Sequence, residues 1–202
     1  MKNKWKWIYN PFEKIAGWQA FGIGILILAA TTVVGFFGSH TLFFPFQVKF
    51  GGFHATWNMA FAVQALSLAV TVILMYVTAL FFAKHVRFQD ILGTVTLAKY
   101  PLLLMAFLMW LICKPLIYFA ASIGMPGEPA LHDYSQLLLI VGFGIIALIM
   151  MVWTIALLYN AFKVSANLKG VKCALLFTAI LLVSDFLVYV PFLLFMNKNI
   201  LR

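Results

Sequence analysis

Acidic residues are scarce in this chain, which has five Asp and Glu against fourteen Lys and Arg. Only 9% of its residues carry a charge, whereas an ordinary soluble domain has about 25%. With 65% hydrophobic residues and a mean hydropathy of +1.05, the chain has too few charged side chains to cover its apolar ones in water. The composition therefore excludes an ordinary soluble domain and predicts a protein embedded in lipid.

Catalytic and metal-binding motifs are also missing. The sequence contains no HExxH, GxSxG, CxxC or phosphate-binding loop. Its two cysteines, Cys113 and Cys173, fall at different predicted depths, so we expect neither a disulfide nor a zinc site. We therefore expect no enzymatic activity, no catalytic residues, no cofactor and no metal. A membrane-embedded lipid enzyme is the alternative, and these missing motifs disfavour it.

Basic residues alternate along the chain between segments that are rich in them and segments that have almost none. Ten of the fourteen lie in three short segments: Lys2, Lys4, Lys6 and Lys14; Lys84, Arg87 and Lys99; and Lys163, Lys169 and Lys172. Short cytoplasmic loops of membrane proteins are enriched in Lys and Arg. The alternation therefore predicts five spans in the cell membrane, with the amino terminus in the cytoplasm and the carboxy terminus outside.

The predicted fold is an all-α integral membrane bundle of five transmembrane helices with short interfacial helices. Its predicted spans are 18–37, 57–82, 102–123, 134–159 and 171–196, preceded by an interfacial amphipathic lead-in at 1–17 and followed by a tail at 197–202. A helix needs about 20 apolar residues to cross the roughly 30 Å of hydrocarbon in a bilayer. Each predicted span meets that length.

Two of the connecting segments carry patterns of their own. Residues 85–99 form the longest basic loop, and their apolar residues share one face of a predicted helix. We expect this short helix to lie at the membrane surface, with Lys99 among its charged residues, before Pro101 leads into the third span. Residues 43–52 are aromatic and contain glycines, so we expect a loop there.

Two charged residues lie inside the predicted spans: Lys114 in the third and Asp185 in the fifth. A charge at the centre of a transmembrane helix costs about 2.5–3.5 kcal/mol on insertion scales. Such groups usually face the bundle interior and find a partner there. Both residues fall in the outer half at comparable depth, which predicts an intramembrane charge pair. The alternative is that Lys114 extends toward the outer surface while Asp185 meets a hydroxyl or water.

The second span carries a polar stripe at helical spacing. Its members are Gln64, Ser67, Thr71 and Thr78. The stripe favours interhelical hydrogen bonds, which contribute about 0.6 kcal/mol each in a membrane bundle. The functional alternative is a polar path through the bundle near Lys114 and Asp185, as in a small transporter or a transporter subunit.

Small residues recur on one face of the first span. The members of this seam are Ala16, Ala20, Gly24, Thr31 and Gly35. Small side chains allow two helix backbones to approach closely in a membrane. The seam therefore predicts a close helix contact, either within the chain or between two copies of it.

Three stretches of the chain carry a family resemblance. They are residues 7–12, residues 87–101, in which Arg87, Asp90, Gly93 and Pro101 mark the motif, and residues 153–170. In their order and character they resemble the Yip family, the Ypt/Rab-interacting membrane proteins, in its short bacterial form. The resemblance implies five helices and a non-enzymatic role in membrane organisation or traffic, in the bacterial cytoplasmic membrane.

The partners that we expect are the lipid bilayer, whose anionic headgroups attract the basic loops, and another membrane protein or a second copy of the chain. Eukaryotic members of the Yip family bind lipidated Rab GTPases. This chain lacks the Asp-Leu-Tyr-Gly-Pro signature of that branch and a sizeable soluble region before the first span, so we do not carry the GTPase partner over. Because the basic residues lie in short loops, we expect no nucleic-acid binding.

Overall fold

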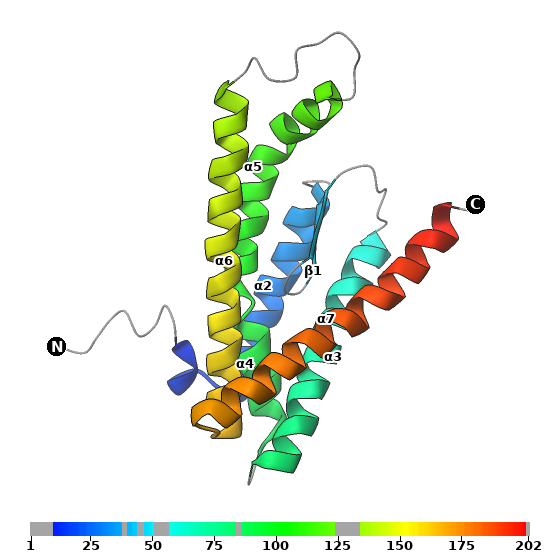
Figure 1. Ribbon diagram of the computed structural model, residues 1–202. Helices are drawn as coiled ribbons and strands as arrows, with labels where there is room; N and C mark the ends of the chain where they lie inside the picture. The colour runs from blue at the N-terminus through cyan, green and yellow to red at the C-terminus, as the bar shows by residue number, and fades with distance from the viewer. Residues whose placement is uncertain are drawn as a thin grey trace, which may run out of the picture.

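The computed structural model describes residues 10–37, 40–43, 47–50, 57–83, 86–123 and 134–200, and within them it describes the side chains except at 40–50, 112–137, 139–140 and 191–200. Its elements are, in chain order, η1 (Pro11–Glu13), α2 (Gly17–Phe37), β1 (His40–Phe43), β2 (Gln47–Phe50), α3 (Trp57–Phe82), α4 (Phe88–Leu97), α5 (Tyr100–Ile123), α6 (Tyr134–Ala166) and α7 (Gly170–Ile200). The protein is an all-α bundle, as predicted, with a small β-hairpin (Figure 1).

Within the described residues, five helical stretches are long and apolar enough to cross a membrane. They are Gly17–Phe37, Trp57–Phe82, Phe88–Leu111, Val141–Ala166 and Gly170–Val190. The first two have the predicted ranges to within one residue, and the last two overlap theirs. The third stretch begins with α4 at Phe88, whereas the predicted span begins at residue 102, and α5 by itself has the predicted range 102–123 to within two residues.

Helices α5 and α6 stand side by side, and α7 crosses α3 at an angle (Figure 1). Helix α4 lies at the lower end of the bundle in this view, in contact with α2, α3 and α6. Its contact with α2 is the most extensive between any two elements. The short helix predicted before the third span therefore forms, and most of its residues are buried against other helices.

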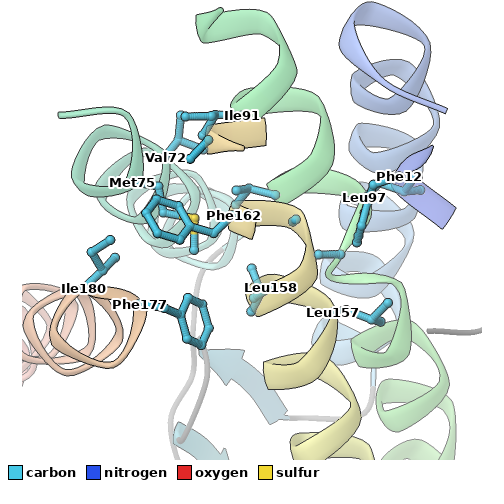
Figure 2. Packing of buried hydrophobic residues seen from close by; sticks show 14 of the residues in the cluster. Phe12, Val72, Met75, Ile91, Leu97, Leu157, Leu158, Phe162, Phe177 and Ile180 are labelled. Carbon is cyan, nitrogen blue, oxygen red and sulfur yellow. The ribbon is translucent and has the colours of Figure 1, made fainter. Parts of the chain in front are cut away.

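The main apolar core lies where α3, α4, α6 and α7 meet. Figure 2 shows Phe162 of α6 beside Met75 of α3, with Phe177 of α7 on the neighbouring side. The ring centroids of Phe162 and Phe177 are 6.5 Å apart. Because lipid is as apolar as these side chains, their contacts stabilise the bundle mainly through van der Waals packing.

The segment before the first span is attached to this core through η1. Asn10 Nδ2 donates a hydrogen bond to Glu13 Oε1 at 2.9 Å, and Pro11 occupies the first turn of the short helix. Between them Phe12 is buried and joins the main core. The lead-in predicted at 1–17 is thus held by an apolar anchor at Phe12, while its first nine residues lie outside the described part of the chain.

Strands β1 and β2 pair in antiparallel register, His40 with Phe50 and Phe43 with Gln47. The sequence pattern predicts a loop at 43–52, so the hairpin is an addition to the expected fold. Strand-favouring residues recur in both arms, which is the signal for it in the sequence. Strand β1 contacts α2, α3 and α5, so the hairpin packs on the bundle at the end of α2.

Exposed basic side chains gather at one end of the bundle. They are Lys14, Arg87, Lys163, Lys169 and Lys172. Lys172 Nζ lies 5.8 Å from the centroid of the Phe82 ring, which brings the start of α7 to the end of α3. The described residues of the three basic segments are therefore neighbours in space, with the exception of Lys99.

Candidate functional site

The third span is broken between α4 and α5, around Lys99. Pro101 has no N–H, so it cannot donate the bond that the carbonyl of Leu97 would accept in a continuous helix. Two shorter-range bonds cross the break. The N–H of Lys99 donates to the carbonyl of Thr96 at 3.4 Å, and the N–H of Leu102 donates to the carbonyl of Lys99 at 3.0 Å. Broken membrane helices of this kind line the binding sites of many transporters.

Lys99 is buried at this break, with 1% of its surface exposed. Its Nζ donates a hydrogen bond to the hydroxyl of Ser67 on α3 at 3.2 Å. Ser67 lies near the middle of the span Trp57–Phe82, so a membrane around the bundle places its contact with Lys99 near mid-depth. Lysines at that depth are rare and costly, and they usually mark a functional site.

The α3 residues around Ser67 form the polar stripe that the sequence predicts. Gln64, Ser67 and Thr71 are buried, and Thr78 is half-buried. Thr71 Oγ1 donates to the carbonyl of Ser67 at 2.7 Å, so this hydroxyl is bonded within its own helix. The stripe therefore faces the bundle interior, where it surrounds the acceptor of the Lys99 ammonium.

The sequence pattern predicts Lys99 in a basic loop at the membrane surface, before a span that begins at residue 102, whereas in the structure its side chain is buried between helices. In the structure nearly every residue of the segment 91–99 is buried. The stretch Phe88–Leu111, which includes Lys99, is 24 residues long and apolar enough to cross a membrane. Its length alone suffices to cross a bilayer. Lys99 is the functional candidate that the sequence does not single out.

The residues that carry the family resemblance surround α4. Arg87 is exposed directly before the helix, Asp90 is half-buried in its first turn, and Pro101 is buried at the break. Gly93 faces α2 so closely that a Cβ atom on it would collide with the carbonyl oxygen of Gly17. These residues therefore position a buried helix in place of the expected surface loop.

A polar contact joins α4 to the end of α6. Thr94 Oγ1 donates to the carbonyl of Asp90 at 2.7 Å and lies 2.8 Å from Ser165 Oγ. The Ser165 hydroxyl is also within 3.4 Å of the Asp90 carbonyl. Together these groups fix α4 against α6 close to the basic end of the bundle.

The small-residue seam of α2 makes a contact within the chain. Four of its five residues are buried: Ala20, Gly24, Thr31 and Gly35. Ala16 is exposed and precedes the helix. A Cβ atom on Gly24 would lie 2.7 Å from the backbone nitrogen of Leu97 and 2.7 Å from the carbonyl carbon of Thr96. Helices α2 and α4 therefore meet backbone to backbone, which is the intramolecular alternative for the seam.

The predicted charge pair is placed only in part. Asp185 is half-buried on α7, next to Ser184, which is fully buried and whose hydroxyl donates to the carbonyl of Leu181 at 3.0 Å. The side chain of Lys114 lies outside the described residues. The pair of Lys114 and Asp185 stays a prediction, and the buried charge that the structure describes is Lys99.

In the part of the chain that the structure describes, most polar groups of the interior are hydroxyls that form hydrogen bonds. Among the described residues, no group of three or more His, Cys, Asp or Glu side chains could hold a metal ion. Cys173 is a free thiol buried in the main core, and the side chain of Cys113 is not described. Thr32 and Thr154 donate to carbonyls of their own helices. These hydroxyls thus bond within the bundle itself.

A groove between α2 and α3, the α2–α3 groove, opens toward the outside of the bundle. It has a volume of about 430 Å³ and an almost wholly apolar lining. Its lining includes Phe21 and Ile25 of α2, Ala65 and Ala69 of α3, and Phe88 of α4. Gln64 lines it as well, one helical turn from Ser67. The groove thus lies beside the Lys99 site and presents mainly hydrocarbon.

Comparisons with protein-family models, with curated proteins and with solved structures find no match for this chain. Its function therefore has to be inferred from its residues and their geometry.

Proposed function

We propose that the protein is a non-enzymatic, multi-pass membrane protein that helps to organise its membrane through contacts with lipids and with other membrane helices. The observation that carries this proposal is the α2–α3 groove, a shaped apolar surface that is open to the surroundings of the bundle. A membrane surrounds these spans with lipid chains, so the groove is a contact site for apolar partners.

A second apolar surface, along α6, supports the same role. Only 17% of the window Val141–Ala166 is buried inside the bundle, against 33% or more for each of the other spans. Its residues Val141, Ile145, Leu148, Ile149 and Val152 recur at helical spacing, and each is more than half exposed. Because lipid tails and apolar side chains are alike in polarity, such a face packs on lipid or on another helix. We expect a partner membrane protein or a second copy of the chain to bind here.

We place the protein in the cell membrane with its basic end in the cytoplasm. Support comes from Lys14, Arg87 and Lys172, which are exposed at one end of the bundle. Cytoplasmic loops carry an excess of such residues, and anionic headgroups attract them. With five spans, this orientation puts the amino terminus inside and the carboxy terminus outside.

The resemblance to the Yip family points to the same kind of role, in membrane organisation or traffic. In this chain the motif residues Arg87, Asp90, Gly93 and Pro101 surround α4, where they hold a buried helix in position. Membership of the family and the nature of the partner are part of the proposal.

Transport is the second candidate function, and Lys99 is the observation that favours it. The ammonium group is buried at mid-depth beside a helix break and hydrogen-bonded to Ser67. Positively charged side chains within pores select anions. A transport path would thus pass Lys99 and the polar stripe of α3, and not only the predicted pair of Lys114 and Asp185.

Reconstitution of the purified chain into proteoliposomes separates the two functions. Uptake of chloride, inorganic phosphate and acetate is measured for the wild type, for Lys99→Met and for Lys172→Met, a control at an exposed lysine. A contact role predicts no uptake above protein-free liposomes in any of the three. Uptake that is lost in Lys99→Met and kept in Lys172→Met would overturn the contact role in favour of transport.

A further inference from the structure

The α2–α3 groove is about as long as one leaflet of a bilayer is thick, and it runs from near the basic end of the bundle to beyond mid-depth. On α3 its lining extends from Phe61 to Ile73, which at 1.5 Å per residue is about 18 Å. The hydrocarbon core of a bilayer is about 30 Å thick, so one leaflet contributes about 15 Å. A single extended acyl chain therefore fits along the groove, whose volume of about 430 Å³ is in the range of ligand sites.

One end of the groove lies beside the basic end of the bundle. Phe88 lines the groove and directly follows Arg87, whose side chain is exposed. Phe21 lines it from α2 and makes an edge-to-face contact with Trp18, with ring centroids 5.9 Å apart. Trp18 is 64% exposed, and exposed tryptophans are enriched at the boundary between hydrocarbon and headgroups. This end of the groove therefore opens at headgroup level, next to a fixed positive charge.

We propose that the α2–α3 groove binds one acyl chain of an anionic phospholipid from the leaflet at the basic end, and that Arg87 binds its headgroup phosphate. The guanidinium group forms strong paired hydrogen bonds with phosphate oxygens. The apolar lining holds the chain, and Arg87 makes the site selective for acidic lipids. This inference rests on the proposed contact function and names one of its lipid partners.

Native mass spectrometry of the full chain in detergent tests the proposal. The protein is titrated with phosphatidylglycerol and, separately, with phosphatidylcholine of the same acyl chains. We expect one phosphatidylglycerol to stay bound at detergent and activation conditions that remove other lipids, with about fivefold tighter binding than phosphatidylcholine. Equal binding of the two lipids, or no retained lipid, would overturn the proposal.

Two variants locate the lipid. In Ala65→Phe/Ala69→Phe both substitutions add bulk at exposed lining positions, so we expect the retained lipid to be lost from a folded protein. Ala179→Phe makes one such substitution at an exposed position of α7 outside the groove, and this variant should retain the lipid. In Arg87→Gln we expect the chain still to bind, with the preference for phosphatidylglycerol reduced to near one.

The outcomes separate this inference from the contact function on which it rests. Retention of the lipid in Ala65→Phe/Ala69→Phe would place it elsewhere on the bundle. That result would contradict the groove site but not the contact function. Anion uptake by proteoliposomes would instead contradict the contact function, whatever lipid the groove holds. Circular dichroism and size-exclusion profiles of each variant establish that a lost lipid is not a lost fold.

Discussion

The Nζ atom of Lys99 donates a hydrogen bond to the hydroxyl of Ser67 at 3.2 Å, joining the break between α4 and α5 to the middle of α3. Both side chains are buried, and Ser67 lies near the centre of its membrane span. The contact therefore places a cationic group at the depth where it costs most. Such a group either has a functional role or stabilises the interruption between α4 and α5.

Lys99→Met tests whether the Lys99 side chain stabilises the fold or has only a functional role. Methionine keeps the length of the side chain and removes the charge, and replacing buried ionic groups with apolar ones is often neutral or stabilising by about 1–4 kcal/mol. We expect the variant to be at least as stable as the wild type in denaturant or thermal unfolding in detergent. A loss of more than about 2 kcal/mol would contradict this and would make the ammonium part of the structural support of the break.

Ser67→Ala is the second substitution of a double-mutant cycle with Lys99→Met, which measures the coupling between the two side chains. Removing the hydroxyl from the wild type takes away an acceptor of Lys99, so we expect a loss of about 1–3 kcal/mol. In the Lys99→Met background the same change should cost little, because the donor is gone. Equal costs in the two backgrounds would show that Lys99 and Ser67 are not coupled.

Gly24→Ala tests the close contact of α2 with α4. A Cβ atom at this position would lie 2.7 Å from backbone atoms of Thr96 and Leu97, and backbone cannot move aside as a side chain can. We expect destabilisation of about 1–3 kcal/mol, the usual cost of overpacking. Gly22→Ala is the matched control, because nothing lies within 4 Å of its added Cβ. Similar unfolding midpoints for the two variants would contradict the contact.

Cysteine labelling tests the proposed orientation. Lys169 is exposed in the turn between α6 and α7, at the basic end of the bundle. In a background without Cys113 and Cys173, Lys169→Cys should react with a membrane-impermeant maleimide only after the cells are opened. Glu128→Cys, in the loop that we predict to be outside, should react in intact cells. The reverse pattern would invert the orientation.

The predicted pair of Lys114 and Asp185 is tested by exchanging the two charges. A buried charge that loses its partner typically costs about 3–5 kcal/mol, so Lys114→Asp and Asp185→Lys should each lower the yield of folded protein. The double exchange should recover much of it, as judged by monodisperse protein in size-exclusion chromatography. If neither single variant loses folded protein, the pair contributes nothing to the fold.

The uninterrupted apolar helices could be predicted from the sequence, and the interrupted one could not. Helix α3 occupies Trp57–Phe82, the predicted range, because its charge-free run is long and bounded by turn and charge signals. In α4 the local pattern is that of an amphipathic surface helix, and only the packing of Gly93 on Gly17 and of Gly24 on Thr96 shows that it is enclosed. Such backbone contacts depend on how distant segments meet.

The candidate site could not be predicted for the same reason: it depends on contacts between distant segments of the chain. In the sequence, Lys99 belongs to a basic segment and is distant from Ser67. The two side chains meet only in the folded structure, so the burial of Lys99 depends on the position of α4. The polar stripe of α3 could be predicted because its spacing alone puts Gln64, Ser67 and Thr71 on one face. The α2–α3 groove could not be predicted, because its lining comes from α2, α3 and α4, which are separate segments of the sequence.

The central claim, that the protein acts through contacts of its outer surface, is tested most directly by native mass spectrometry of the wild type extracted from its own membranes in mild detergent. The account predicts a chain that carries a stoichiometric anionic phospholipid, a second membrane protein or both. A bare chain with neither lipid nor partner, under conditions that preserve known membrane complexes, would contradict it.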